Sequence, residues 1–179
     1  DHQDDLELRF PLLYRDVIES NAAEYGIDPS WVYGVVRQES AFVVDARSQA
    51  GALGLMQLMP ATGRLAGRKI NMRIRSNQAL LNIENNLRLG ASYLKEVLGR
   101  NNGNQVLATA AYNAGPHRVS VWLPGKTMDA DIWVDTIPFS ETRDYVKNVM
   151  SYTAVYDHRL GSHPVRLQDR MQIVYPSEK

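Results

Sequence analysis

The sequence predicts an all-α fold, and three observations indicate this class. Apolar residues recur at helical spacing along most of the chain. Gly, Pro and Asn residues separate these periodic segments, and no stretch alternates apolar and polar residues for long enough to form a regular strand. The pattern leaves room for one short β-hairpin within residues 65–76. The unequal lengths of the segments argue against a regular four-helix bundle or a solenoid.

The first helices are bounded by recognisable turn and cap residues. A helix over about 12–25 is expected to end at Gly26. Asp28 then provides an N-cap for the next helix, 29–40. Pro29 suits its first position, because proline lacks the N–H that this position leaves unpaired.

Further helices follow a loop over 41–53 that is rich in small residues. They are expected over about 53–60, 60–67, 79–99, 105–114, 116–123, 129–137 and 140–160. The tail over 162–179 is mixed, with an extended pattern at 172–176.

The length and composition fit one globular domain. A chain of 179 residues can bury a substantial core, and its 44% apolar and 22% charged residues are ordinary for globular proteins. No apolar run reaches the roughly 20 residues that cross a bilayer. Lys and Arg number 20, as do Asp and Glu, so the balance gives no electrostatic case for nucleic acid. The basic run at 64–75 is most simply interpreted as a solvated surface loop.

Cysteine and histidine usage narrows the chemistry. The absence of cysteine excludes disulfides, cysteine-ligated zinc and thiol nucleophiles. No metal site is expected, because the histidines form neither an i, i+4 pair nor an HExxH pattern; they are His2, His117, His158 and His163. The chain begins DHQDDLELRF without Met, and we expect a processed protein or a part of a longer one.

Glu39 is the carboxylate that the helical periodicity singles out. It follows Val32 by seven residues and Val36 by three, so on a helix it lies on their apolar stripe. Burial there would raise the pKa of the carboxyl, as a general acid near neutrality requires. The alternative is an ordinary ion pair with Arg37, Arg47 or another cation at the end of the helix, and spacing alone modestly favours the ion pair.

Four segments, taken in order, resemble a known family. They are RQESAF at 37–42, GALGLMQLMP at 51–60, ATAAYNAGPHRV at 108–119 and IPFSETRDYVKNVM at 137–150. Their order and separation resemble the catalytic domain of soluble, Slt-type lytic transglycosylases, which are related to goose-type lysozymes. The resemblance covers about residues 20–160. It implies a lysozyme-like helical domain with a substrate cleft.

The resemblance also implies roles for the residues at matching positions. Glu39 matches the family's single catalytic acid/base. Seven other residues match substrate-binding positions of the cleft: Ser48, Gln57, Met59, Tyr112, Asn113, Glu141 and Tyr145. The Tyr112 hydroxyl is expected near the catalytic carboxylate, and Glu141 is expected to bind substrate without acting as a nucleophile. Tyr145 fits a cleft residue and a core tyrosine about equally well.

The implied activity is cleavage of the β-1,4 bond between N-acetylmuramic acid and N-acetylglucosamine in peptidoglycan, for cell-wall turnover. The muramyl C6 hydroxyl attacks its own C1 and leaves a 1,6-anhydromuramic end, so one catalytic carboxylate suffices. Neither a metal nor an organic cofactor is implied. Two alternatives stay open: a goose-type-lysozyme-like muramidase that hydrolyses the bond, and a non-catalytic peptidoglycan-binding module.

The resemblance suggests a division of the chain. Residues 1–20 are expected to be a linker or lead-in helix from a preceding domain, 21–163 the catalytic domain, and 164–179 a tail packed on it. A longer, periplasmic protein of a Gram-negative bacterium is implied, with an N-terminal helical superhelix. The implied partners are peptidoglycan glycan strands, with cell-wall synthases or secretion machinery as further candidates and no nucleic acid.

Overall fold

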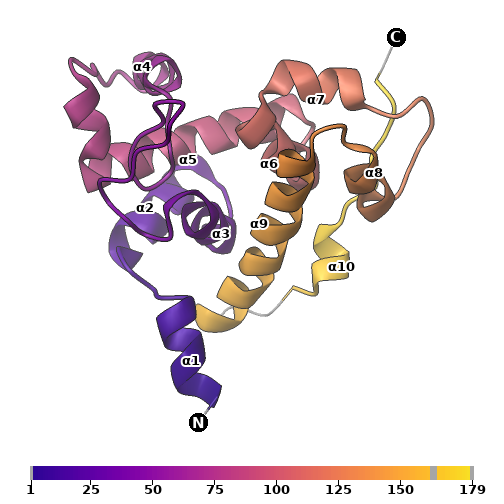
Figure 1. Ribbon diagram of the computed structural model, residues 1–179, viewed down its shortest axis with the longest axis horizontal. Coiled ribbons are helices and arrows are strands. Elements are labelled where there is room, and N and C mark those ends of the chain that lie inside the picture. The colour runs from indigo at the N-terminus through magenta and orange to yellow at the C-terminus, as the bar shows by residue number, and fades with distance from the viewer. Residues whose placement is uncertain (1, 162–164, 178–179) are drawn as a thin grey trace.

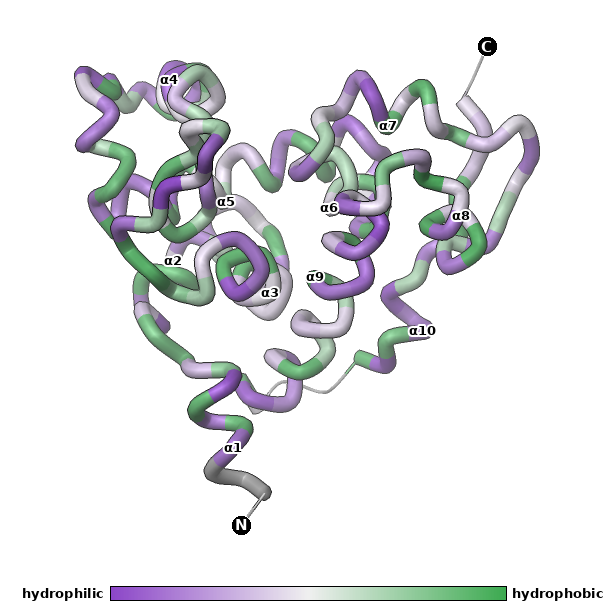
Figure 2. Tube along the Cα trace, viewed as in Figure 1, coloured by the Kyte–Doolittle hydropathy of each residue, from purple (hydrophilic) through white to green (hydrophobic). Residues whose placement is uncertain are grey.

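The computed structural model describes residues 2–161 and 165–177 and confirms the helical class (Figure 1). In chain order the helices are α1 (His2–Arg9), α2 (Arg15–Tyr25), α3 (Pro29–Ser40), α4 (Pro60–Lys69), the 3₁₀ helix η1 (Asn77–Leu81), α5 (Ile83–Arg100), α6 (Gln105–Ala114), α7 (Pro116–Trp122), α8 (Ala130–Thr136), α9 (Ser140–Arg159) and α10 (Leu167–Arg170). None of these helices is long and apolar enough to cross a membrane. Apolar and polar residues are interleaved along the helices, as amphipathic packing requires (Figure 2).

The expected boundary between the first two long helices is confirmed. Gly26 ends α2 in a left-handed conformation with φ of 59°. Asp28 then caps α3, because its Oδ1 atom accepts a hydrogen bond of 2.8 Å from the Ser30 N–H. Pro29 occupies the first turn of α3. These caps fix where α3 starts, and so determine which residues lie in its last turn.

Helix α3 is the centre of the core and packs closely against α9. Residues 30–36 of α3 are all buried, and the Trp31 indole donates a hydrogen bond of 3.0 Å to Thr109 Oγ1 of α6. Gly34 lies where α3 touches α9. A Cβ atom there would come within 2.7 Å of Thr153 Oγ1 and 2.9 Å of the Val149 carbonyl oxygen. The absence of a side chain at Gly34 therefore sets how closely the two helices approach.

The helix expected over 53–60 is wrong, because the segment up to Met59 forms a closed loop. Leu53 and Leu58 exchange two backbone hydrogen bonds of 3.0 Å. Gly54 and Gln57 have φ of 76° and 45°, which no α-helix contains. A Cβ on Gly54 would lie 2.5 Å from Asn86 Nδ2, so only glycine fits this turn. The apolar run is buried because the loop passes through the core.

The short hairpin expected within 65–76 does not form. Helix α4 continues to Lys69, and the chain then returns along it towards η1. Among the described residues, β-pairing is limited to isolated bridges. Two of them pair Leu53 with Arg47 and with Leu58, and the third pairs Met128 with Val174. The expected helix 79–99 is divided into η1 and α5 at Asn82, which caps α5.

The last described segment is tied to the domain by a buried cation. Arg170 of α10 lies 2.6 Å from Asp157 of α9 and 2.6 Å from Asp28, the cap of α3. Asp157 is 2% exposed, so its charge depends on this partner. These two ion pairs therefore hold α10 against the start of α3 and the end of α9.

Substituting Gly34→Ala should force α3 away from α9. The added methyl group meets backbone and side-chain atoms of α9, so we expect a loss of about 1–3 kcal/mol in the free energy of unfolding. Urea unfolding measures this loss. Gly99→Ala is the matched control, because its Cβ would meet nothing within 4 Å on an exposed helix surface. The control should stabilise the chain by about 0.5–1 kcal/mol, and equal effects of the two changes would contradict the close-packing interpretation.

Candidate active site

Glu39 lies in the last turn of α3, where the chain leaves the helix at Ala41 with φ of 48°. Its side chain faces α9, and the Tyr145 hydroxyl donates a hydrogen bond of 2.7 Å to Glu39 Oε1. Surrounding protein atoms remove water from the carboxyl, and this desolvation raises its pKa to about 7. The hydrogen bond from Tyr145 lowers the pKa and the negative charge of Glu141 raises it, but desolvation dominates.

Tyr145 is fixed as a donor to this carboxyl. It is 4% exposed, and burial holds the pKa of its hydroxyl well above the usual value, with the charge of Glu39 adding to the effect. The hydroxyl therefore keeps its proton at any pH at which the protein works. Glu141 precedes Tyr145 by one turn of α9, so the two side chains share a face of that helix.

The alternative ion pair of Glu39 does not form among the described residues. Arg37 donates a hydrogen bond of 2.9 Å to the Arg9 carbonyl oxygen. Its guanidinium lies over the rings of Phe10 and Tyr152. Glu39 therefore has a neutral hydrogen-bond donor as its partner, and its carboxyl is partly protonated near pH 7.

The loop over 53–58 is held directly behind the carboxyl. Ser40, which follows Glu39, donates a hydrogen bond of 2.8 Å from its hydroxyl to the Leu55 carbonyl oxygen. The Tyr112 hydroxyl donates 2.9 Å to the Met56 carbonyl oxygen. The hydroxyl that touches Glu39 is therefore that of Tyr145. Tyr112 lies near enough for the charge of Glu39 to raise its pKa, but its proton is directed to the loop.

Asn86 of α5 clamps the same loop and was not identified from the sequence. It is 1% exposed, its Oδ1 accepts 2.7 Å from the Met56 N–H, and its Nδ2 donates to the Leu53 and Leu80 carbonyl oxygens at 2.9 and 2.7 Å. One turn later, Gly90 lies against the Met56 side chain, so close that a Cβ would collide with it. The sequence does carry a signal for this clamp: Asn86 and Gly90 lie four positions apart on an otherwise apolar face of α5.

Three further predicted site residues lie in or next to this loop: Ser48, Gln57 and Met59. Ser48 is exposed, and its hydroxyl accepts 3.0 Å from the Ala52 N–H. The Gln57 amide nitrogen donates to the Ala46 and Gly54 carbonyl oxygens at 3.1 and 2.8 Å, so it stabilises the loop's own fold. Met59 is 43% exposed immediately before α4.

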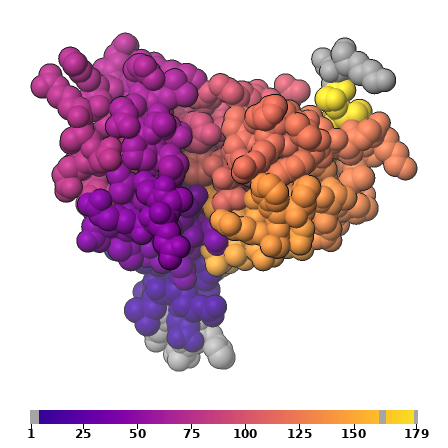
Figure 3. Space-filling model, turned by 45° about the horizontal axis from the view of Figure 1, so that its top comes forward, coloured from indigo at the N-terminus to yellow at the C-terminus, as the bar shows by residue number. Residues whose placement is uncertain are grey.

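Asn113 and Glu141 line one cavity of about 430 Å³. The Thr142 hydroxyl donates 2.7 Å to Asn113 Oδ1 and so orients that amide. Glu141 is exposed. The structure thus brings Asn113 of α6 and Glu141 of α9 to the same cavity. In the space-filling view, the part that contains α3 and α4 lies directly beside the part that contains α7 and α9 (Figure 3).

The arrangement around Glu39 is suited to acid chemistry. Among the residues that the structure describes, no group of three or more Asp, Glu or His side chains is suited to holding a metal ion. What the arrangement supplies is one carboxyl that can give up and take back a proton near neutral pH.

Known families and structures match this chain over most of its length. A family model described as transglycosylase SLT domain matches residues 16–134, and one described as soluble lytic transglycosylase helical domain matches 136–164. The soluble lytic murein transglycosylase of Salmonella typhimurium is 41% identical over 169 residues, which are 93% of this chain and 26% of the relative. The enzyme of the same name from Escherichia coli K12 is 42% identical over 164 residues, 90% of this chain and 25% of the relative.

Two solved structures share the fold. An inactive mutant of lytic transglycosylase Slt from Pseudomonas aeruginosa superimposes with a TM-score of 0.88 at 46% identity, over 94% of this chain and 28% of that one. The 70-kDa soluble lytic transglycosylase of Escherichia coli gives 0.85 at 39% identity, over 95% and 27%. The chain therefore spans about a quarter of the length of the relatives it matches.

Removing the clamp with Asn86→Ala should loosen the loop behind Glu39. The change removes the buried Asn86 partner of the Met56 N–H and of the Leu80 carbonyl oxygen, while the Leu53 carbonyl oxygen keeps only the Leu58 N–H, so we expect a loss of about 2–4 kcal/mol in the free energy of unfolding. Urea unfolding measures it. Asn148→Ala, at an exposed position of α9, is the control and should change stability by less than about 0.5 kcal/mol. A cost below about 1 kcal/mol for Asn86→Ala would contradict the clamp.

Proposed function

The chain belongs to the transglycosylase SLT domain family, and on this premise we propose that it cleaves the glycan strand of murein as a lytic transglycosylase. The observation that carries the proposal is the state of Glu39. Its carboxyl has a pKa of about 7, a neutral donor in Tyr145, and no cationic partner among the described side chains. A carboxyl of this kind is half protonated near neutrality and can act first as an acid and then as a base.

The first step uses the protonated form of Glu39. We propose that it gives its proton to the glycosidic oxygen between N-acetylmuramic acid and N-acetylglucosamine while the bond from C1 to that oxygen breaks. The oxygen of the muramyl 2-acetamido group bonds to C1 and stabilises the positive charge as an oxazolinium. Tyr145 keeps its hydrogen bond to the carboxylate that remains and stabilises the new charge.

The second step uses the ionised form. The C6 hydroxyl of the same muramyl residue attacks C1, the acetamido oxygen leaves C1, and the hydroxyl proton returns to Glu39. The product is a 1,6-anhydromuramic end, and no water is consumed. Intramolecular attack by a held hydroxyl has an effective concentration of about 10⁵ M or more. A second catalytic carboxylate is unnecessary, and Glu141, exposed in its cavity with Asn113, is assigned to substrate binding.

We assign the other cleft residues to binding as well. Gly51 and Gly54 let the backbone approach a sugar. Gln57 and Asn113 carry amides that suit acetamido and hydroxyl groups. Ser48 and Met59, both exposed, and Tyr112, behind the loop, complete the set.

We also propose the context of the domain. Because the relatives are about four times as long, residues 1–20 would lead in from a preceding helical superhelix, 21–163 would form the catalytic domain and 164–179 its tail. We propose a periplasmic location in a Gram-negative bacterium, because the substrate is murein and similar enzymes come from Salmonella typhimurium and Escherichia coli. Cell-wall synthases or secretion machinery are candidate partners.

Substituting Glu39→Gln should abolish turnover and preserve the fold, because glutamine has nearly the same shape but no acidic proton to transfer. We expect release of soluble products from purified sacculi to fall by roughly 10²–10⁴-fold. Mass spectrometry of the wild-type products should show anhydromuramic ends, each lighter by one water than a hydrolysed end. Glu84→Gln, an exposed carboxylate of α5, is the control and should keep the wild-type rate.

Other product patterns would replace the proposal with a rival. Reducing muramic ends would indicate a hydrolase, and binding to sacculi without any release would indicate a binding module. Substantial release by the Glu39→Gln variant would remove Glu39 from the mechanism.

The pH dependence of kcat/KM should follow the ionisation of Glu39. The acid must carry its proton in the free enzyme, so the rate should fall as pH rises through about 7. Tyr145→Phe removes the hydrogen bond that lowers this pKa, and the alkaline limb should move to higher pH while kcat falls. Tyr175→Phe, an exposed tyrosine of the tail, should leave the profile unchanged. A limb that stays in place in Tyr145→Phe would mean that another group titrates.

A further inference from the structure

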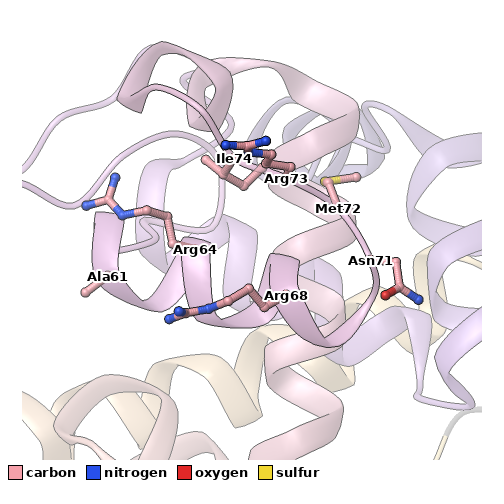
Figure 4. A pocket seen from close by; sticks show the side chains of 7 residues that line it. All are labelled: Ala61, Arg64, Arg68, Asn71, Met72, Arg73 and Ile74. Atoms are coloured by element: carbon pink, nitrogen blue, oxygen red, sulfur yellow. The ribbon is translucent and has the colours of Figure 1, made fainter.

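The cavity between α6 and α9 is lined by an amide and a carboxylate. The amide is that of Asn113 and the carboxylate that of Glu141. The larger cavity at α4, of about 720 Å³, has a different lining, because Arg64, Arg68 and Arg73 surround it (Figure 4). Arginine side chains can only donate hydrogen bonds, whereas an amide and a carboxylate together can donate and accept. The cavity at α9 therefore suits a ligand group that itself both accepts and donates.

Thr142 determines which atom of the Asn113 amide faces the cavity. It is 1% exposed in the first turn of α9, and its hydroxyl donates a hydrogen bond of 2.7 Å to Asn113 Oδ1. The oxygen and the nitrogen of an amide point in different directions from the same carbon. Holding the oxygen at Thr142 therefore leaves Asn113 Nδ2 for the cavity, and this nitrogen donates to no group of the described residues.

The packing of α6 against α9 sets the position of this pair. Thr109, one turn before Asn113 on α6, contacts Met150 Sδ of α9 at 3.9 Å. Met150 lies about two turns after Thr142, so the two helices touch at two places and run in opposite directions. Thr109 also accepts the hydrogen bond from the Trp31 indole of α3. The contact between Thr142 and Asn113 is thus made by two packed helices and does not depend on a loop.

The rest of the lining favours a neutral ligand with an apolar face. Arg118 and Glu141 both line the cavity, and their opposite charges give it no preference for an anion or a cation. Phe139 is exposed in the same lining, with the Arg118 guanidinium 5.0 Å from the centre of its ring. The Trp122 ring packs edge-on against it at 5.2 Å. A fixed aromatic surface beside polar groups suits a sugar ring, which has C–H groups on its faces and polar groups at its edge.

A 2-acetamido group on such a sugar matches the polar groups of the cavity. It has one carbonyl oxygen that accepts and one N–H that donates. Asn113 Nδ2 can donate to the oxygen while the Glu141 carboxylate accepts from the N–H. If the Asn113 amide were turned over, two carbonyl oxygens would face each other with no proton between them. The hydrogen bond from Thr142 prevents this arrangement.

We propose that Thr142 is a positioning residue, which holds the NH₂ group of Asn113 towards the cavity and so makes the cavity select sugars that carry a 2-acetamido group. The inference rests on the proposed function, because that function brings an N-acetylated glycan to this cavity. Thr142 acts through Asn113, and the selection is separate from the proton transfer by Glu39.

Binding of two neutral trisaccharides tests this role without turnover. The chain with Glu39→Gln, used as the parent, is titrated by NMR with chitotriose, the trimer of N-acetylglucosamine. Cellotriose, which has hydroxyl groups in place of the acetamido groups, is the comparison ligand and should bind more weakly. Thr142→Val keeps the shape of the side chain but removes the hydroxyl. It should weaken chitotriose binding by about 5-fold or more and leave cellotriose binding within about 2-fold.

Two further variants separate positioning from a general loss of structure. Thr142→Ser keeps the hydroxyl and should retain the preference for chitotriose. In the chain with Asn113→Ala, adding Thr142→Val should weaken chitotriose binding by less than about 2-fold, because the residue through which Thr142 acts is gone. Thr127→Val is the matched control, at an exposed threonine between α7 and α8, and should leave both affinities within about 2-fold.

Several outcomes would overturn the proposal. They are equal binding of chitotriose and cellotriose by the parent, an unchanged preference in Thr142→Val, a loss in Thr142→Ser or Thr127→Val as large as that in Thr142→Val, and a full further loss when Thr142→Val is added to Asn113→Ala. Failure of the proposed function has a separate signature, since the chain with intact Glu39 would then release no anhydromuramic product from sacculi.

Discussion

The hydrogen bond from Tyr145 to Glu39 is the contact on which the site depends, and it exists only because α3 and α9 touch. The two residues are 106 positions apart in the chain. Gly34 on α3 lets the helices approach until a methyl group would not fit between them. At that separation the last turn of α3 presents Glu39 to Tyr145 in the second turn of α9, and the carboxyl loses enough water for its pKa to reach about 7. The close packing of α3 and α9 thus raises the pKa of Glu39, so that the carboxyl can hold its proton near neutral pH.

The loop behind the carboxyl is held by polar groups in an apolar setting. Ser40, Asn86 and Tyr112 come from three different helices, and each pairs with a backbone group of residues 53–56. Each bond satisfies a backbone group that burial would otherwise leave unpaired. The loop can therefore cross the core without regular secondary structure and still present Gln57 and Met59 at fixed places. A helix there would satisfy its own backbone but would turn these side chains elsewhere.

The net charge of the whole chain is zero, but its arginines stand in very different surroundings. Arg170 is buried between Asp157 and Asp28, where it ties the end of the described chain to the two central helices. Arg64, Arg68 and Arg73 lie at the opposite extreme, exposed around a cavity without acidic partners. The basic run that looks like an ordinary solvated loop in the sequence becomes a lined cavity only because Gly67 lets the chain fold back on α4.

The sequence by itself determined the helical class, the capped start of α3 at Asp28 and Pro29, most of the later helix bounds, and Glu39 as the residue of interest. These features are local, since periodicity, caps and glycine act within a few residues. It could not distinguish the loop over 53–58 from a helix, because an apolar run is buried in either form. Nor could it choose between an ion pair and a hydroxyl as the partner of Glu39, or show which backbone groups Asn86 binds. Only the tertiary structure decided these points, because each depends on contacts between residues at least 30 positions apart, and such contacts leave no periodic trace in the chain.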